Sequence, residues 1–249
     1  MWRELSGKAM AVCSLALAVG TLAACESTQS ESARLGREGK TALNQKGVAV
    51  AHRSKDFEVI STTVLQDSNG AAAVVELRNT SRKALTAAPI SIDVLGRNGS
   101  SVFRNNAPGL EPTLAHVPVV PAGKRFTWVN DQVSPTARAG SIRAVVGAGR
   151  AVDGNHLPAV SVQGARLESD PVSGVAATGF AANRSNVDQR KLVITAVARR
   201  GSRVVAAGRG QIPRLKPGKR ARFQIFFIGD PRGASLDLEA PASTLGGGA

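Results

Sequence analysis

Side chains that carry chemistry are scarce in this chain. Its 249 residues include no Tyr, 3 His, 2 Cys and 2 Trp. His52, His116 and His156 are far apart in the sequence, so none has another His at the spacing of a metal site. No Gly-x-Ser-x-Gly turn is present to support a Ser-His-acid triad. The sequence therefore predicts no catalytic residue and no metal site, and we expect that the protein is not an enzyme.

Phosphate-binding loops are also missing. The segments 123–124 and 218–219 both read Gly-Lys, but Pro118 and Pro213 stand where the loop needs its first Gly. Basic residues follow where the loop has Ser or Thr. The Gly-rich segment 147–149 lacks the third Gly of a dinucleotide-binding fingerprint. We therefore expect no bound cofactor.

Both cysteines lie near the N-terminus. Cys13 lies in the apolar run 11–20, which follows the basic residues Arg3 and Lys8. A positive segment, a short apolar run and small residues in this order are typical of a secretory signal peptide. Residues 22–25 read LAAC and resemble, at all four positions, the lipobox of bacterial lipoproteins.

The lipobox resemblance implies a lipid anchor on Cys25. In that family the thiol at this position receives a diacylglycerol, and cleavage removes the preceding residues, here 1–24. Each buried methylene contributes about 0.8 kcal/mol to membrane binding, so two or three acyl chains hold such a protein at the membrane. We expect the anchored protein to lie at the extracytoplasmic face of a cell membrane, in the periplasm or at the cell surface. The alternatives are an uncleaved N-terminal anchor and an ordinary cleaved signal with a Cys there by chance.

The charge of the chain is strongly positive. Lys and Arg total 32 against 18 Asp and Glu, which gives a formal net charge of +14. Such an excess attracts anionic polymers or lipid headgroups. It does not predict nucleic-acid binding, because aromatic residues for base stacking are not interleaved with the basic ones. The alternative is an Arg-rich composition that reflects coding bias on a solvated surface.

The folded part is expected to begin near Phe57. Residues 25–55 are polar and mixed in charge, which indicates a flexible, lipidated tether. Beyond them, apolar and polar residues alternate in short runs, as in 73–78, 90–94 and 126–129, and Asn- and Gly-rich turns separate the runs. Alternation with period two places one set of side chains on a core face. The sequence therefore predicts an all-β fold.

The landmarks of this pattern occur twice in the same order. In each copy a strand ends in Asn-x-Ser, at Asn79 in the first and Asn183 in the second. A second strand with a Gly turn follows, and then Gly-Lys-Arg before an aromatic strand. The repeat predicts two copies of one fold. Asn-x-Ser is a glycosylation acceptor in some secreted proteins. Here we expect the Asn and Ser side chains to close each strand by bonding the local backbone.

The repeated unit resembles the small immunoglobulin-like β-sandwich modules of exported bacterial lipoproteins, of the FxLYD-like kind. The resemblance covers about 57–146 and 160–240 and rests on the Asn-x-Ser strand end and the Pro-Gly turn before an aromatic strand. The segment 223–227 is nearest to the family's namesake motif, although it lacks the Tyr and the Asp. The resemblance implies a non-catalytic binding or spacer role.

These observations predict two tandem immunoglobulin-like β-sandwiches after a signal peptide and a flexible tether. The expected boundaries are a signal peptide at 1–24, a lipidated tether at 25–55, copy one at 56–147, a linker at 148–158, copy two at 159–240 and a disordered tail at 241–249.

The last strand of copy two is apolar on both faces. Phe223, Ile225 and Phe227 share one face, and Phe226 and Ile228 share the other. A strand that is apolar on both faces is usually buried on both. We expect the second face to be covered by copy one or by a partner, which makes Phe226 and Ile228 candidate partner contacts.

The expected function is that of a lipid-anchored binding or structural module of the cell envelope. Its partner would be another envelope protein or an anionic envelope polymer, in addition to the membrane itself. One alternative is an accessory solute-binding lipoprotein with a pocket between the two sandwiches. A second is an unrecognised hydrolase; Glu168 and Asp170 could form a carboxylate pair, but the nearby Pro171 and Gly174 indicate a hairpin tip.

Overall fold

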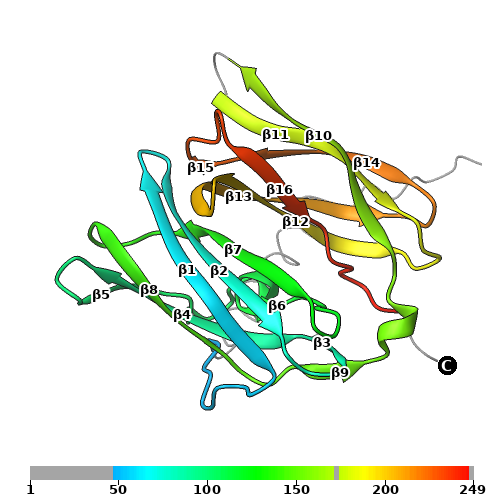
Figure 1. Ribbon diagram of the computed structural model, residues 1–249, viewed down its shortest axis with the longest axis horizontal. Coiled ribbons are helices and arrows are strands. Elements are labelled where there is room, and N and C mark those ends of the chain that lie inside the picture. Colours follow the sequence, from blue (N-terminus) through cyan, green and yellow to red (C-terminus); the bar gives the residue numbers. More distant parts are fainter. Residues whose placement is uncertain (1–46, 171–173, 247–249) are drawn as a thin grey trace, which may run out of the picture. The chain divides into compact units, whose positions relative to one another are not determined.

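Antiparallel sheets make up the folded chain, as the sequence predicts. The computed structural model describes residues 47–170 and 174–246 (Figure 1). Within these ranges the chain forms strands and two short 3-10 helices, and no α-helix occurs. No helix in the described part is long and apolar enough to cross a membrane. Cys25, the signal peptide at 1–24 and most of the predicted tether lie outside the described residues.

Strands β1 to β9 form the N-terminal strand group. They are β1 (Phe57–Asp67), β2 (Gly70–Asn79), β3 (Ala84–Thr86), β4 (Ala88–Gly96), β5 (Ser101–Arg104), β6 (His116–Val117), β7 (Arg125–Val133), β8 (Ala139–Val146) and β9 (Arg150–Val152). One sheet has the order β1-β2-β7. In the other, β4 pairs with β5, β6 and β8. The 3-10 helix η1 (Pro112–Leu114) precedes β6.

Strands β10 to β16 form the C-terminal strand group. They are β10 (Val160–Asp170), β11 (Gly174–Asn183), β12 (Gln189–Arg200), β13 (Arg203–Leu215), β14 (Arg220–Phe226), β15 (Ile228–Gly229) and β16 (Ser235–Glu239). One sheet has the order β10-β11-β14 and the other β15-β13-β12-β16. These pairings repeat the pattern of the N-terminal group, with β10, β11 and β14 in the places of β1, β2 and β7. The repeat in the sequence is thus matched by a repeat of strand pairing.

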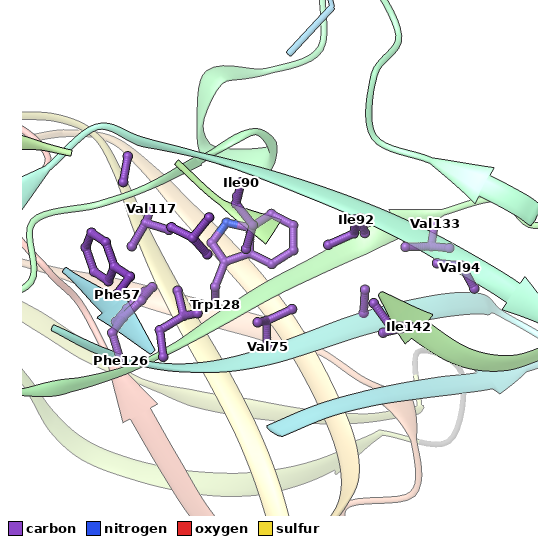
Figure 2. Close-up of a cluster of buried hydrophobic side chains, with 14 of the residues drawn as sticks. Phe57, Val75, Ile90, Ile92, Val94, Val117, Phe126, Trp128, Val133 and Ile142 are labelled. Carbon is purple, nitrogen blue, oxygen red and sulfur yellow. The ribbon is translucent and has the colours of Figure 1, made fainter. Parts of the chain in front are cut away.

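Each strand group has its own hydrophobic core, built by the alternating residues. In the N-terminal group, Val75, Ile92 and Trp128 meet between the two sheets (Figure 2). Trp128 is only 2% exposed. In the C-terminal group, Ile194 on β12 and Ile225 on β14 belong to the corresponding cluster. Close approach of the sheets there depends on Gly208, where a Cβ would come within 2.0 Å of the carbonyl oxygen of Phe226.

A third cluster joins the two groups. It consists of Ala72, Val74 and Val129 from the N-terminal group and Val197, Val204, Ala207 and Ile228 from the C-terminal group. Because side chains alternate along β2, Ala73 faces the N-terminal core while Val74 faces the other group. The sheet β1-β2-β7 is therefore covered on both faces. The described residues accordingly belong to one compact unit.

The Asn-x-Ser segments close their strands as the sequence predicts. The buried Asn79 amide donates to the carbonyls of Lys83 and Val120 at 2.8 and 2.9 Å. Its carbonyl oxygen accepts from the backbone N–H and the hydroxyl of Ser81 at 3.0 and 2.8 Å. Asn183 repeats this network with the equivalent residues of the second group. Because both amide nitrogens are engaged donors, this arrangement does not fit the glycosylation alternative.

Phe226 and Ile228 do not share a face, which corrects the interpretation of this strand. β14 ends at Phe226, and the chain then moves to the other sheet, where Ile228 pairs with Ala207 on β13. Ile228 is 8% exposed within the third cluster, whereas Phe226 is 48% exposed. The prediction from period-two alternation is wrong beyond Phe226, because the chain passes from one sheet to the other at Phe227. A partner contact at Phe226 stays a prediction.

The predicted linker and tail are tied to the strand groups. The linker contains β9 and the 3-10 helix η2 (Gly154–His156), and β9 pairs with β3. The first part of the tail is held by Gln189, whose amide oxygen accepts from the backbone N–H of Ser243 and of Thr244. Both segments are thus fixed by hydrogen bonds that link residues far apart in sequence.

We predict that Asn79→Ala lowers the free energy of unfolding by about 2–4 kcal/mol, because it leaves several buried backbone groups without partners. The exposed Asn69 in the β1–β2 turn is the matched control, and Asn69→Ala should change the value by less than about 0.5 kcal/mol. Denaturant titration of the full chain carrying Trp2→Phe, followed by Trp128 fluorescence, measures both. Equal effects of the two variants would contradict the structural role of Asn79.

The two faces of β14 should also differ in stability experiments. Phe223 is 5% exposed in the C-terminal core, so Phe223→Ala should cost about 3–5 kcal/mol. Phe226→Ala should cost less than about 1 kcal/mol, because that side chain is half exposed already. Denaturation midpoints of the two variants in the full chain, followed by far-UV circular dichroism, test this difference. A comparable loss in both would place Phe226 in the core.

Candidate functional site

A groove lies where the two strand groups meet, and we call it the junction groove. Its volume is about 330 Å³. One wall is formed by β7 and the segment 112–119, and the other by the first half of β12 and the segment 241–243. The alternating residues of β12 decide this position, because Leu192 and Ile194 face the C-terminal core while Val193 and Thr195 face the groove.

The floor of the junction groove is apolar. Trp128, Phe126 and Val129 of β7 contribute to it, together with Val117 and Val193. The indole N–H of Trp128 donates to the backbone carbonyl of Thr113 at 3.2 Å, which fixes the orientation of the ring. Figure 2 shows Trp128 close to Ile90 and Val117 within the N-terminal core. The same aromatic side chain therefore supports the core and borders the groove.

Two strained residues border the groove at equivalent places in the repeat. Ala87 has a φ of 53° and Lys191 a φ of 49°, and they are the non-glycine residues with positive φ in the described ranges. They follow Asn79 and Asn183 at the same distance in sequence. A left-handed conformation costs an L-residue about 1–3 kcal/mol and persists only where the surrounding structure imposes it. Both copies therefore bend the chain beside the groove.

A buried Arg209 connects the two groups at the groove. Its side chain is 7% exposed, and its guanidinium donates to the Thr113 hydroxyl at 2.6 Å. Carboxylate oxygens of Glu111 and Asp131 lie 3.9 and 4.0 Å from it. The backbone N–H of Arg209 also donates to Asp131 at 2.9 Å. Its charge is therefore compensated within the protein.

Burial has opposite effects on the two charges of this pair. It raises the pKa of Asp131, although the Arg209 charge and hydrogen bond oppose the rise. It lowers the pKa of Arg209, while Asp131 and Glu111 oppose that change. Removing two charges from water costs several kcal/mol per ion, and their mutual attraction offsets this cost only with good hydrogen bonding. The Arg209 contacts therefore fix the relative position of β13 and β7 more than they add stability.

The rim of the groove carries exposed positive charge. Arg190 and Lys191 lie at the start of β12, and the Arg190 side chain is 70% exposed. The nearest carboxylate oxygen to Arg190 is that of Asp188, at 3.9 Å, and this oxygen accepts a shorter hydrogen bond of 2.7 Å from Arg214. Among the described residues, no Asp or Glu lines the groove. The rim is therefore positive and the floor apolar.

A second ionisable contact between the groups involves Glu239 at the end of β16. Burial raises the pKa of Glu239 to about 7, and the neighbouring Asp237 adds to the rise. A hydrogen bond with the backbone of Thr127 on β7 and the charge of Arg199 oppose it. Glu239 therefore changes charge close to neutral pH at the contact between the strand groups.

The residues singled out in the sequence are dispersed. His116 lines the junction groove, and its Nδ1 lies 3.1 Å from the carbonyl oxygen of Pro112. His156 bonds Asp153 at 2.5 Å on the exposed helix η2. Phe226 lies on the outer face of β14, outside the residues that line the groove. In the described part of the chain, no group of three or more His, Cys, Asp or Glu could hold a metal ion.

Arg209, Trp128 and Lys191 are the groove residues that sequence reasoning missed. Arg209 and Asp131 are 78 residues apart in the sequence, and no local pattern brings them together. The alternation on β12 was the only available signal, because Val193, Thr195 and Val197 leave a largely apolar stripe on the face opposite the core.

Comparison with known proteins gives no further assignment: no family model matches this chain, and no curated protein matches it significantly.

The charge change at Glu239 predicts a dependence of stability on pH. Its pKa is about 7 in the folded protein and has the usual value of 4.5 in the unfolded chain. The folded state therefore holds the proton more tightly, and stability falls as pH rises from about 4.5 to about 7. Above pH 7 the ionised Glu239 lowers the free energy of unfolding by about 3 kcal/mol at most.

Glu239→Gln removes this cost and keeps an acceptor for the Thr127 backbone. We predict that the variant is more stable than the wild type at pH 8 and equal to it at pH 4.5, as measured by denaturant midpoints. The exposed Asp237→Asn is the control for the loss of a negative charge on β16 and should show a much smaller difference. A constant difference between Glu239→Gln and wild type at all pH values would show that Glu239 does not titrate in this range.

Proposed function

We propose that this chain is a lipid-anchored protein of the cell envelope whose folded part is a non-catalytic binding module. The order of basic residues, apolar run and LAAC ending at Cys25 supports the anchor. The absence of a tyrosine, a Gly-x-Ser-x-Gly turn and closely spaced histidines in the sequence supports a binding role over a hydrolytic one.

Each strand group is, in this proposal, an immunoglobulin-like β-sandwich of the FxLYD-like kind. In support, two antiparallel sheets enclose a separate core cluster in each group. The turns before β7 and β14 both place a glycine at positive φ, with 69° at Gly123 and 66° at Gly218. The hydrogen bonds of Asn79 and Asn183 are the same in the two groups. Sandwiches of this kind act as binding or spacer modules.

The junction groove is the observation that carries the binding role. A rigid spacer needs only a stable contact between its modules, and the third cluster supplies that. The groove is an additional feature, in which residues of both groups form an apolar concavity with polar groups at its rim. Ligand sites are commonly concave, mostly apolar and placed at such interfaces. This favours a small solute bound between the two modules.

A second candidate site is the outer face of the sheet β10-β11-β14. Phe226 is 48% exposed there, and Arg222 and Arg220 of β14 lie on the same face by the strand alternation. The Arg220 guanidinium lies 4.8 Å from the centre of the Phe180 ring. An exposed aromatic beside arginines is a composition enriched in protein interfaces. This face would contact another envelope protein or an anionic envelope polymer.

The anchor is tested by fractionation of cells that express the full chain. We predict that the wild type lies in the membrane fraction and incorporates labelled palmitate. Cys25→Ser should incorporate no label and either leave the membrane fraction or remain unprocessed. Cys13→Ser, which removes the other cysteine of the same segment, should behave as wild type. If Cys25→Ser keeps both the label and the membrane location, the proposed anchor is wrong.

A further inference from the structure

We propose that the junction groove binds a small amphipathic monocarboxylate, a molecule with one apolar chain and one carboxylate of the fatty-acid type. This proposal rests on the proposed binding function and specifies the ligand class of its site. Its four supports are the size of the groove, the composition of its floor, the charge of its rim and the strained backbone beside it.

The size of the groove suits a single apolar chain. Its volume of about 330 Å³ lies at the lower end of the range of roughly 300–1,000 Å³ found for small-molecule sites. The groove is bounded by two walls whose relative position is fixed by Arg209 and by the third cluster. A preformed site of this kind loses little conformational freedom on binding.

The floor provides mainly apolar contact, and Thr195 adds one hydroxyl to it. Trp128 donates its one N–H to the protein itself. Val117, Val193 and Pro241 have no polar side-chain atoms. Burial of apolar ligand surface here is favourable by about 25 cal/mol per Å². A sugar or a peptide backbone would lose hydrogen bonds to water in the same place, so an aliphatic chain is the better occupant.

The rim selects the charge of the ligand. Arg209 has its charge compensated by Asp131 and Glu111 and is not available to a ligand. Arg190 and Lys191 are exposed, and the described lining residues include no carboxylate. Asp188, 3.9 Å from Arg190, is hydrogen-bonded to Arg214. A negative group at the mouth of the groove would therefore be attracted, and a positive one repelled.

The conformation of Lys191 supplies the fourth support. Its φ of 49° is strained for a residue with a side chain, and a Gly at the same place would be relaxed. Strain of this kind is concentrated at ligand sites, where it orients a functional group at a cost in stability. Lys191 is also one of the residues that line the groove, so this strain lies at the site itself. Ala87 has the same strain on the opposite wall but no charge.

The test uses Trp128 as the reporter. The chain has no Tyr and only 2 Trp, so the full chain with Trp2→Phe emits from Trp128 alone. Bromine quenches tryptophan emission on contact. We expect ω-bromodecanoate to quench Trp128 saturably, and ω-bromodecanol, the neutral analogue, to bind about tenfold more weakly, as the loss of about 1.4 kcal/mol would give. Equal binding of the two would overturn the role of the charged rim, and no saturable quenching would overturn the site.

Four variants of the same chain separate ligand binding from folding. Lys191→Glu should weaken ω-bromodecanoate binding by about tenfold or more, whereas Lys219→Glu, the same change at an exposed turn outside the groove, should leave it unchanged. Val193→Phe fills part of the groove without changing charge or adding a second tryptophan, and it should abolish saturable quenching, with the far-UV circular dichroism spectrum retained. Lys191→Gly should raise the denaturation midpoint and weaken binding together.

The outcomes distinguish this proposal from the proposed function. If Lys191→Glu and Lys219→Glu weaken binding equally, the effect is one of net charge and the assigned rim is wrong. If Val193→Phe retains binding, the ligand occupies another place. Either result leaves the lipid anchor at Cys25 intact, because fractionation and palmitate labelling test it without any ligand.

Discussion

The packing of one sheet on both of its faces determines most of this structure. Strand β2 is apolar at consecutive positions, and alternation sends Ala73 and Val75 to one side and Ala72 and Val74 to the other. The N-terminal core covers only the first side. Leaving the second side in water would expose a contiguous apolar patch, so the C-terminal group packs on it through β12, β13 and β15. Two repeats that could each enclose a core are thereby joined into one unit.

The polar contacts at this junction give it a definite register. Hydrophobic packing alone is non-directional. Arg209 with Asp131 and Glu111, and Glu76 with Arg199, connect β13 and β12 to β7 and β2. Glu239 adds a contact that costs stability, because its pKa of about 7 leaves it partly ionised where it is buried at neutral pH. A surface designed only for stability would not place a carboxylate there.

The groove is a consequence of how two equal modules meet. The segment 112–119 lies in the connection from the second strand of the repeat to Gly-Lys-Arg, which is longer in the first copy. With the start of β12, this segment lines the junction groove, to which both repeats contribute residues. The left-handed residues Ala87 and Lys191 show that both copies bend at the same place. Only the second copy places a charge there, so duplication followed by divergence is enough to produce an asymmetric site.

Much of the fold could be predicted from the sequence, because its causes are local. The alternation of apolar residues gave the strands and the all-β class, and Asn79 and Asn183 marked strand ends through hydrogen bonds to residues close to them. Cys25 is assigned by its neighbours in the sequence and stays a prediction. The error at Phe226 and Ile228 has a tertiary cause, because nothing in the local pattern reveals that a strand changes sheets at Phe227.

The candidate site could not be predicted in the same way. Arg209 is distant in sequence from Asp131 and Thr113, and each of these residues alone is an ordinary surface residue of its own strand or turn. Val193, Thr195 and Val197 form a largely apolar stripe, but the stripe does not tell what covers it. By itself the sequence determined which residues alternate, where turns occur and where charge is in excess, since these depend on near neighbours. Only the tertiary structure decided which face meets which, because that choice depends on burying two distant apolar surfaces together.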